Sequence, residues 1–250
     1  MSIGWLEACW PAPPGVRAGI SLRDGGVSRG AYASLNLGAH VGDTPAAVAR
    51  NRALLRTELL LPAEPLWLEQ VHGTAVVDVD RLDPAVPTPR ADAAVSRRPG
   101  TVLAVLVADC LPVLFAARDG SAIGAAHAGW RGLAAGVLEA TVAALSSSAA
   151  LQAWLGPSIG PAHFEVGAEV REAFVSHDRE AATGFSANAR GRWQADLAAL
   201  ARARLSRLGV ESISAEQGCC FAEPQRFFSY RRDGTTGRMA ALIWRAAPQC

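Results

Sequence analysis

The 250-residue sequence has no marked excess of either charge and no long uninterrupted apolar segment. Lysine and arginine together number 24, aspartate and glutamate number 23, and the formal net charge is +1. This balance removes the electrostatic argument for binding nucleic acid or an anionic membrane surface. The longest apolar stretch, residues 101–117, is interrupted by Asp109 and Pro112, so it is too short and too punctuated to span a bilayer.

The first residues and the cysteines also lack the patterns of a secreted protein. Residues 1–7 contain no basic segment followed by a long apolar run, so no secretory signal is expected. The five cysteines are odd in number and irregularly spaced, which does not favour a disulfide framework. We therefore expect a cytoplasmic protein, in which a free thiol is available as a metal ligand. No repeat and no low-complexity linker divides the chain, which favours a single domain over residues 1–250.

Hydrophobic periodicity and turn residues predict alternating strands and helices. Thr44 followed by Pro45 is typical of a helix start, and this helix is expected to continue to about Leu59. Residues 102–107 form a continuous apolar run, which predicts a strand covered on both faces. The other expected strands are 66–70, 75–79, 113–117, 122–126, 153–155 and 240–244, and the other expected helices are 133–145, 167–176 and 194–208.

Two histidines and one cysteine stand near the ends of these expected strands. His72 lies in the turn after the first of them, Cys110 follows residues 102–107, and His127 ends the strand that returns from the 118–120 turn. Three nitrogen and sulfur ligands with a fourth position left free are typical of catalytic zinc. A cysteine behind an apolar strand is also common as a small core residue. The spacing alone therefore leaves a metal site and ordinary structural roles both open.

Asp109 and Arg131 are the candidate catalytic residues. If the chain turns after residues 102–107, the Asp109 carboxylate could orient a metal ligand or act as a general base. Arg131 lies between two glycines at an expected helix start, where free backbone N–H groups favour an anion such as phosphate. The glycines could instead serve only a tight turn. Arg23 and Arg231 offer further guanidiniums for phosphate, and His40 either lines the site or bonds a loop, with the loop preferred.

Five short motifs follow one another along the chain. They are EQVHG at residues 69–73, ADCLPV at 108–113, HAGWRG at 127–132, GPSIGP at 156–161 and FFSYRRD at 227–233. In this order they resemble the laccase-domain family, whose members are also called polyphenol oxidases, YfiH-type proteins and purine nucleoside phosphorylases. The resemblance extends over residues 15–244, nearly the whole chain, and five motifs in order are far more specific than any one of them.

The resemblance implies a fold, a cofactor and a reaction. The family fold is of the α/β (α+β) class, with mixed β-sheets packed as a sandwich and helices outside. By the same resemblance, His72, Cys110 and His127 hold zinc. Family members are described as phosphorylases of adenosine, inosine and methylthioadenosine with adenosine deaminase activity in addition, so a nucleoside and phosphate are the expected partners. The candidate substrate-binding residues are Arg23, Asn36 and Arg231.

Two alternative activities stay open. Older descriptions of the family name copper-dependent polyphenol oxidases, and two histidines with one cysteine can form a blue-copper site. Such a site usually has an axial methionine, but this chain has only Met1 and Met239, and its five histidines are too few for several coppers. We therefore rank oxidation below phosphorolysis. Some bacterial members are credited with editing cytoplasmic peptidoglycan precursors, which a zinc hydrolase could do with an activated water.

Overall fold

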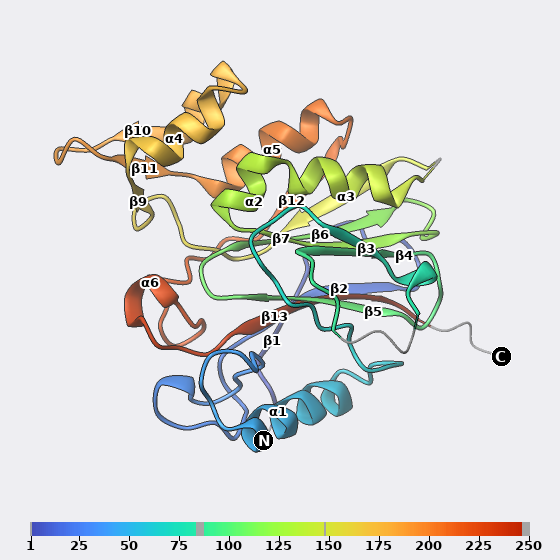
Figure 1. Ribbon diagram of the computed structural model, residues 1–250. Coiled ribbons are helices and arrows are strands. Elements are labelled where there is room, and N and C mark those ends of the chain that lie inside the picture. The colour runs from blue at the N-terminus through green and yellow to red at the C-terminus, as the bar shows by residue number, and fades with distance from the viewer. Residues whose placement is uncertain (1, 84–87, 148, 247–250) are drawn as a thin grey trace.

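Two stacked β-sheets form the centre of the molecule (Figure 1). The structure is a computed structural model that describes residues 2–83, 88–147 and 149–246. One sheet has the strand order β1 (Trp5–Glu7), β2 (Val16–Ser21), β13 (Met239–Arg245), β5 (Val102–Val107). The other has the order β12 (Ser212–Ala215), β8 (Leu151–Leu155), β6 (Leu111–Ala117), β7 (Ile123–Ala128), β4 (Ala93–Ser96), β3 (Val76–Asp78).

The two sheets differ in strand direction. All pairs of the four-stranded sheet are antiparallel. In the six-stranded sheet, β12 runs parallel to β8 and β3 runs parallel to β4, whereas the central pairs are antiparallel. The hairpin expected around residues 118–120 joins β6 and β7, the two central strands.

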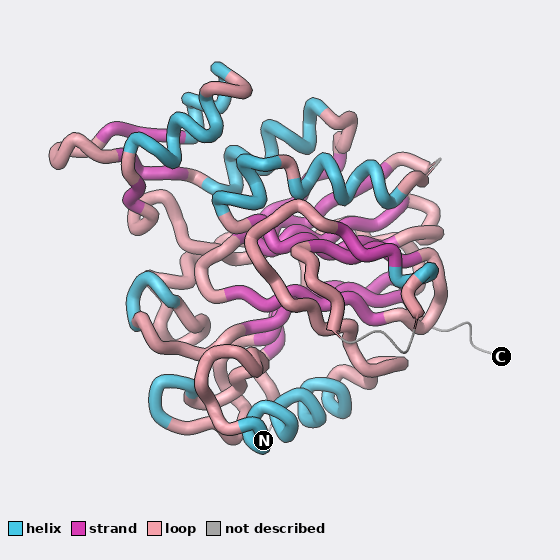
Figure 2. The backbone as a smooth tube through the Cα atoms, viewed as in Figure 1, coloured by secondary structure: helices cyan, strands magenta, loops and turns pink. Residues whose placement is uncertain are grey.

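Helices cover both outer faces of the stacked sheets, so strands lie between helical layers (Figures 1 and 2). The four-stranded sheet is covered by α1 (Pro45–Glu58), and the six-stranded sheet by α2 (Trp130–Ala135), α3 (Val137–Leu145) and α5 (Leu197–Arg207). A third sheet and α4 (Ala168–Val175) project at one end; its strands, in order, are β10 (Phe185–Ala187), β11 (Trp193–Ala195) and β9 (Glu165–Val166). The short helices are η1 (Gly30–Tyr32), η2 (Val79–Arg81), η3 (Arg179–Gly184) and α6 (Tyr230–Asp233). The predicted single-domain sandwich with flanking helices is confirmed.

The burial of β5 explains its continuous apolar sequence. Leu103 and Val105 pack between the two sheets, whereas Val102 and Leu106 pack in the layer beneath α1. Successive side chains of a strand point to opposite faces, so a strand buried on both faces needs apolar residues at every position. The prediction of a strand covered on both faces is therefore confirmed.

Three expected elements differ from the structure. Residues 66–70 form only isolated bridges instead of a strand. The helix expected over residues 133–145 is two helices, because Gly136 adopts a φ of 103° and ends α2 before α3 begins. The helix expected over residues 194–208 begins only at Leu197, because β11 occupies residues 194 and 195 and the side chain of Asp196 caps α5.

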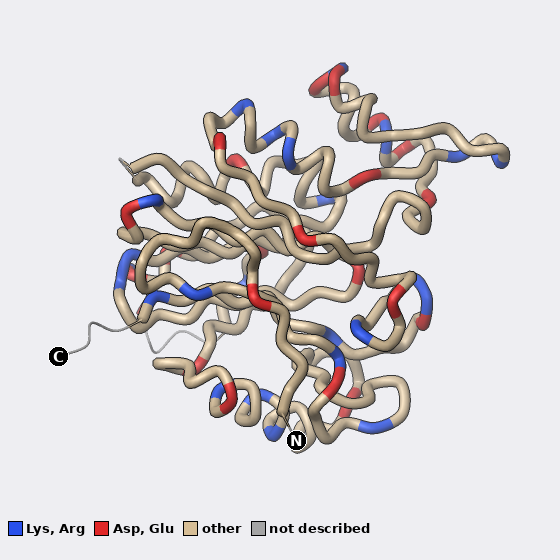
Figure 3. Tube along the Cα trace, turned by 180° about the vertical axis from the view of Figure 1, so that it is seen from behind, with Lys and Arg blue, Asp and Glu red and all other residues tan. Residues whose placement is uncertain are grey.

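Charged residues, which are coloured along the backbone trace in Figure 3, lie mainly on helices and loops, and the strands contain few of them. This distribution agrees with sheets that are buried on both faces, since an unpaired charge is costly to bury. Within the described ranges, no helix has the length and apolar character that crossing a membrane requires.

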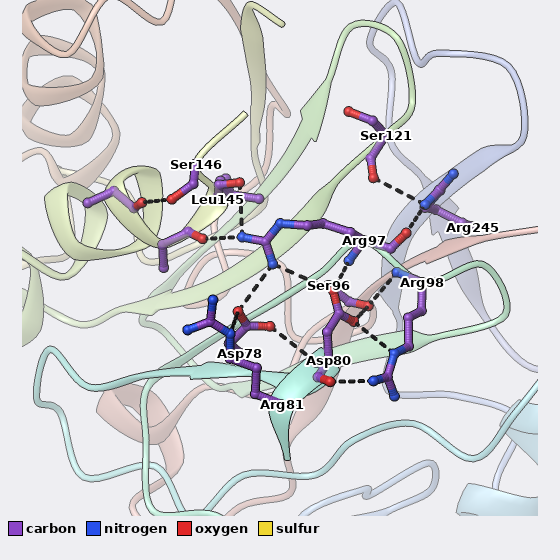
Figure 4. A network of polar contacts seen from close by, with 12 residues as sticks. Asp78, Asp80, Arg81, Ser96, Arg97, Arg98, Ser121, Leu145, Ser146 and Arg245 are labelled. Atoms are coloured by element: carbon purple, nitrogen blue, oxygen red, sulfur yellow. Dashed lines mark hydrogen bonds and ion pairs between the residues drawn. The ribbon is translucent and has the colours of Figure 1, made fainter. Parts of the chain in front are cut away.

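A polar network centred on Asp80 and Arg97 joins the segment before β5 to the end of α3 and to β13 (Figure 4). The Asp80 carboxylate accepts hydrogen bonds from Ser96 Oγ at 2.7 Å and from the backbone nitrogen of Arg97 at 2.8 Å. The Arg97 guanidinium forms an ion pair with Asp78 at 3.2 Å, and the Arg245 guanidinium donates to the Arg97 carbonyl. Because Arg97 precedes β5 and Cys110 follows it, this network and the candidate metal ligands lie beyond opposite ends of the same strand.

Candidate metal centre

The side chains of His72, Cys110 and His127 meet at one end of the sheets. Cys110 lies in the tight connection between β5 and β6, and His127 is near the end of β7. Antiparallel pairing puts Pro112 opposite His127, so the residues just before β6 lie beside that histidine. The ligand atoms of the three residues all lie within 4.8 Å of one another. The structure thus brings the three candidate ligands together.

His72 reaches the cluster from the loop before β3, and this loop is fastened to β5. The Gln70 side chain donates to the Leu106 carbonyl at 2.9 Å and accepts from the Leu106 backbone nitrogen at 2.7 Å. His72 has a φ of 60°, and Asp109 has a φ of 92°. Residues other than glycine rarely adopt such values, and strained backbone of this kind is often found at functional sites.

Gly129 lies against the cluster so closely that a side chain would collide with it. A Cβ atom at this position would be 2.9 Å from His72 Cδ2 and 3.0 Å from Cys110 Sγ. A Cβ atom on Gly132 would be 2.8 Å from the carbonyl oxygen of Gly73. Both glycines of the 127–132 motif are therefore required by close packing around the ligands, whatever anion the segment binds.

A buried carboxylate that the sequence analysis missed supports two of the ligands. Asp92 has no exposed surface, and its Oδ1 lies 2.8 Å from Nδ1 of His127. The same carboxylate accepts hydrogen bonds from the backbone nitrogens of Val71, His72 and Gly73. Burial raises the pKa of Asp92, but the bonds from His127 and these backbone groups outweigh it and leave that pKa lowered.

The cluster favours an ionised thiol. Burial raises the pKa of Cys110, but the neighbouring His127 and His72 lower it to about 6. Burial lowers the pKa of His127, but the Cys110 and Asp92 side chains raise it to about 9. The thiolate is the form of cysteine that binds metals, so the electrostatics of the cluster prepare Cys110 for that role.

The donor atoms fit a metal ion of the zinc type. Asp92 occupies Nδ1 of His127, which leaves Nε2 as its ligand atom, and Nε2 of His72 lies 3.8 Å from Cys110 Sγ. Two imidazole nitrogens and a thiolate suit zinc, and suit copper less simply. Three protein ligands leave a coordination position for water or substrate.

The three ligands line a cavity of about 450 Å³ that also contains several guanidinium groups. Three arginines of its wall each lie over an aromatic ring of the same wall. These pairs are Arg131 over Trp130 at 4.4 Å, Arg231 over Phe164 at 5.2 Å and Arg238 over Tyr230 at 5.7 Å. The cavity therefore combines positive charge with flat apolar surfaces. A larger cavity of about 750 Å³ runs along α1, and none of the candidate site residues lines it.

Both candidate catalytic residues line the metal cavity. The Asp109 carboxylate accepts from Ser229 Oγ at 2.6 Å and from the backbone nitrogen of Arg231 at 2.7 Å. Burial raises the pKa of Asp109, although these hydrogen bonds oppose the shift. The guanidinium of Arg131 makes no hydrogen bond or ion pair with any residue in the described parts of the chain, so it is available to a ligand.

The candidate substrate-binding residues are divided between the cavity and the scaffold. Arg231 lines the cavity and donates to the Glu165 carbonyl at 3.0 Å. Arg23 is not in the cavity wall, and its guanidinium donates to the carbonyl groups of Ala33 and Pro224. Asn36 is fully buried outside the wall, which gives it no direct access to a substrate there.

Asn36 instead supports an arginine that the sequence analysis did not single out. Its Oδ1 accepts from the backbone nitrogen of Arg238 at 2.9 Å, and Arg238 lines the cavity. His40 also lines the cavity, contrary to the loop interpretation. For Asp92, the one sequence signal is a lone carboxylate among alanines at the start of an apolar strand, which local spacing does not connect to His127.

Comparisons with known proteins agree with the motif resemblance. A model of the family described as multi-copper polyphenol oxidoreductase laccase matches residues 17–246. Purine nucleoside phosphorylase YfiH of Escherichia coli (strain K12) is 53% identical over 236 residues, which cover 94% of this chain and 96% of that protein.

Two solved structures share the fold over almost their whole length. Protein NMB0706 of Neisseria meningitidis has a TM-score of 0.92 at 49% identity, with 98% of this chain and 100% of that chain covered. YlmD of Geobacillus stearothermophilus has a TM-score of 0.86 at 34% identity, with 98% and 97% covered. The chain therefore belongs to the multi-copper polyphenol oxidoreductase laccase family.

Proposed function

We propose that this protein is a zinc-dependent purine nucleoside phosphorylase. The observation that carries the proposal is a cluster of two imidazoles and a thiolate in one cavity with three arginine–aromatic pairs. The name of the Escherichia coli relative supports the reaction, because 94% of this chain aligns with that protein at 53% identity. Cavities of this size commonly bind small molecules.

In phosphorolysis, a phosphate oxygen forms a bond to C1′ of the ribose while the bond from C1′ to N9 of the purine breaks. Arg131, Arg231 and Arg238 would attract and orient the phosphate through charge-assisted hydrogen bonds. Zinc on the three ligands would act as a Lewis acid toward a phosphate oxygen or toward water. Trp130 and Tyr230, the less buried aromatic side chains of the cavity wall, offer rings on which a purine can stack.

We further propose adenosine, inosine and methylthioadenosine as substrates, with deamination of adenosine as a side activity. Deamination would require water to add at C6 of the purine, as activated hydroxide does in other zinc deaminases. The sequence has no Pro-Cys-x-x-Cys motif, and its one His-x-Glu triplet, His163-Phe164-Glu165, lies outside the three-ligand cluster, so this activity would use a different kind of site.

Oxidation of phenols is the alternative that the family description favours. The described part of the chain holds one three-ligand cluster of histidine and cysteine. Met239, the methionine that could act as an axial ligand, is fully buried between the sheets, where its sulfur accepts from the backbone nitrogen of Phe228 at 3.0 Å. This arrangement supports a single zinc-type centre better than a copper oxidase. A zinc hydrolase acting on peptidoglycan precursors would use the same ligands.

The decisive experiment is incubation with inosine or adenosine, with and without phosphate, while free base, ribose-1-phosphate and ammonia are quantified. We expect phosphate-dependent release of base that is lost in Cys110→Ala and retained in Cys9→Ala, which removes an exposed thiol outside the cluster. Zinc-loaded protein that turns over no purine nucleoside would contradict the proposal. Phenol oxidation that depends on added copper would favour the oxidoreductase, and amide cleavage in a cell-wall precursor would favour the hydrolase.

A further inference from the structure

Asp92 is the fully buried carboxylate nearest the metal ligands, and four donors converge on it. Its Oδ1 lies 2.8 Å from Nδ1 of His127 and accepts from the backbone nitrogen of His72 at 2.9 Å. Its Oδ2 accepts from the backbone nitrogens of Gly73 at 2.7 Å and Val71 at 3.1 Å. One oxygen is therefore shared by the side chain of one metal ligand and the backbone of another.

The backbone of Asp92 strengthens this link. Its carbonyl oxygen accepts from the backbone nitrogen of His127 at 2.7 Å, and its own nitrogen donates to the Ala75 carbonyl at 3.1 Å. Asp92 precedes β4, which pairs with β7 on one side and β3 on the other. It thus lies between the strand that carries His127 and the loop that carries His72.

We infer that Asp92 is a positioning residue of the metal centre, which sets the tautomer of His127 and the loop conformation of His72 together. The inference rests on the proposed metal centre. A carboxylate only accepts hydrogen bonds at neutral pH, so the proton of a neutral His127 ring lies on Nδ1. Nε2 is then left with its lone pair free for the metal. The same carboxylate holds the three successive N–H groups around His72, whose φ of 60° needs such support.

An asparagine cannot replace Asp92, although it has nearly the same shape. Its side chain has one acceptor oxygen and an amino group with two donors. If the oxygen faced His127, the amino group would face the N–H groups of Val71 and Gly73. If the amino group faced His127, Nδ1 would have to accept, and the ring proton would move to Nε2, the nitrogen required by the metal. Either orientation disturbs one of the two ligands.

Zinc affinity tests this inference without any measurement of enzyme activity. Wild type, Asp92→Asn and the control Asp80→Asn are titrated with zinc against a chromophoric chelator. Asp80 is likewise a hydrogen-bonded carboxylate with a lowered pKa, but it is only partly buried and belongs to the network before β5. We expect Asp92→Asn to bind zinc about 10–100-fold more weakly than wild type, as is usual when a carboxylate behind a ligating histidine is lost. Asp80→Asn should bind as wild type does.

A second measurement uses wild type alone, so it does not depend on whether Asp92→Asn folds. In zinc-loaded wild type, nitrogen NMR of the imidazoles should show His127 protonated at Nδ1 and metal-bound through Nε2. The opposite tautomer, or a zinc affinity of Asp92→Asn within threefold of wild type, would overturn the inference. Wild type that binds no zinc would overturn both the inference and the metal centre, whereas zinc binding without phosphorolysis would overturn only the proposed reaction.

Discussion

The carboxylate of Asp109 lies 2.7 Å from the backbone nitrogen of Arg231, a residue 122 positions away in the sequence. The same carboxylate accepts from Ser229 Oγ at 2.6 Å. Asp109 adjoins the candidate metal ligand Cys110, and Arg231 lines the cavity. These two hydrogen bonds therefore hold the turn that carries the thiolate at a set position relative to a guanidinium that faces the proposed phosphate.

Replacing Asp109 by alanine should impair catalysis more than metal binding. We expect kcat/KM for phosphorolysis to fall about 100-fold, because a small displacement of a positioned catalytic group lowers the reaction rate strongly. Bound zinc should stay near one per chain. Ser229→Ala removes only one of the two bonds and should have a smaller effect. The pH profile of kcat separates this positioning role from the general-base role predicted from the sequence. If Asp109 is a general base, the variant should lose the fall of kcat at low pH. If Asp109 only positions its neighbours, that fall should remain. Wild-type kinetics in Asp109→Ala would exclude both roles.

Arg131→Gln should weaken phosphate binding. The Arg131 guanidinium has no polar partner among residues 2–83, 88–147 and 149–246, so its charge is available to an anion in the cavity. Loss of one charge-assisted hydrogen bond predicts a KM for phosphate raised about 10-fold or more. Arg118→Gln is the matched control, because Arg118 is exposed and outside the cavity wall. An equal phosphate KM in the two variants would contradict this role.

Gly129→Ala should disrupt the metal centre sterically. The added methyl group would lie 3.0 Å or less from atoms of both His72 and Cys110, so one of them must move. Overpacking of this kind typically costs about 1–3 kcal/mol, and we expect substoichiometric zinc after purification. At Gly218 a Cβ meets its nearest neighbour at an ordinary 3.4 Å, so Gly218→Ala should retain zinc. Equal zinc content in the two variants would be inconsistent with the close packing.

The thiol of Cys110 should be reactive at neutral pH once zinc is stripped. Its pKa of about 6 makes the thiolate fraction rise with pH through 6 and approach its maximum near pH 7 to 8. The rate of iodoacetamide alkylation, followed by mass spectrometry at Cys110, should level off in the same range, because the thiolate is the nucleophile. Zinc should protect the residue. A rate that still climbs steeply above pH 8 would show that the two imidazoles do not lower this pKa.

Asp80 should contribute to stability at neutral pH and not in acid. Burial raises the pKa of Asp80, but hydrogen bonds from Ser96 and Arg97 outweigh it, and the net shift is downward. A lowered carboxylate pKa stabilises the folded state above the unfolded value and loses that effect as pH falls through the folded value. We expect Asp80→Asn to reduce the free energy of unfolding by about 2 kcal/mol at pH 7. The difference from wild type in denaturant titrations should shrink toward pH 3, and a constant difference would refute the assignment.

The main strands and helices were predictable because their signals are local, whereas the layered sandwich was expected from the resemblance of the five motifs to the family. The continuous apolar run of β5 and the start of α1 at Thr44 and Pro45 were expected from the sequence and are present. The division of residues 133–145 at Gly136 was missed, because glycine inside a helical pattern does not by itself reveal a left-handed φ. The start of α5 was not predictable from periodicity, because the helical pattern of residues 194–208 does not show that Asp196 caps the helix and that β11 precedes it.

The sequence by itself determined the three candidate ligand residues, the glycines beside them and the family to which the chain belongs. Only the tertiary structure decided which acidic residue accepts hydrogen bonds from the candidate ligands and which one contacts another segment. Asp109 is adjacent to Cys110 in the chain, yet its φ of 92° and its partners Ser229 and Arg231 turn it toward the distant C-terminal segment. Asp92 is not adjacent in sequence to any candidate ligand, yet its carboxylate contacts His127 because β4 and β7 pair in the sheet. Such hydrogen bonds depend on which strands become neighbours in the sheet, and local sequence patterns do not specify that pairing.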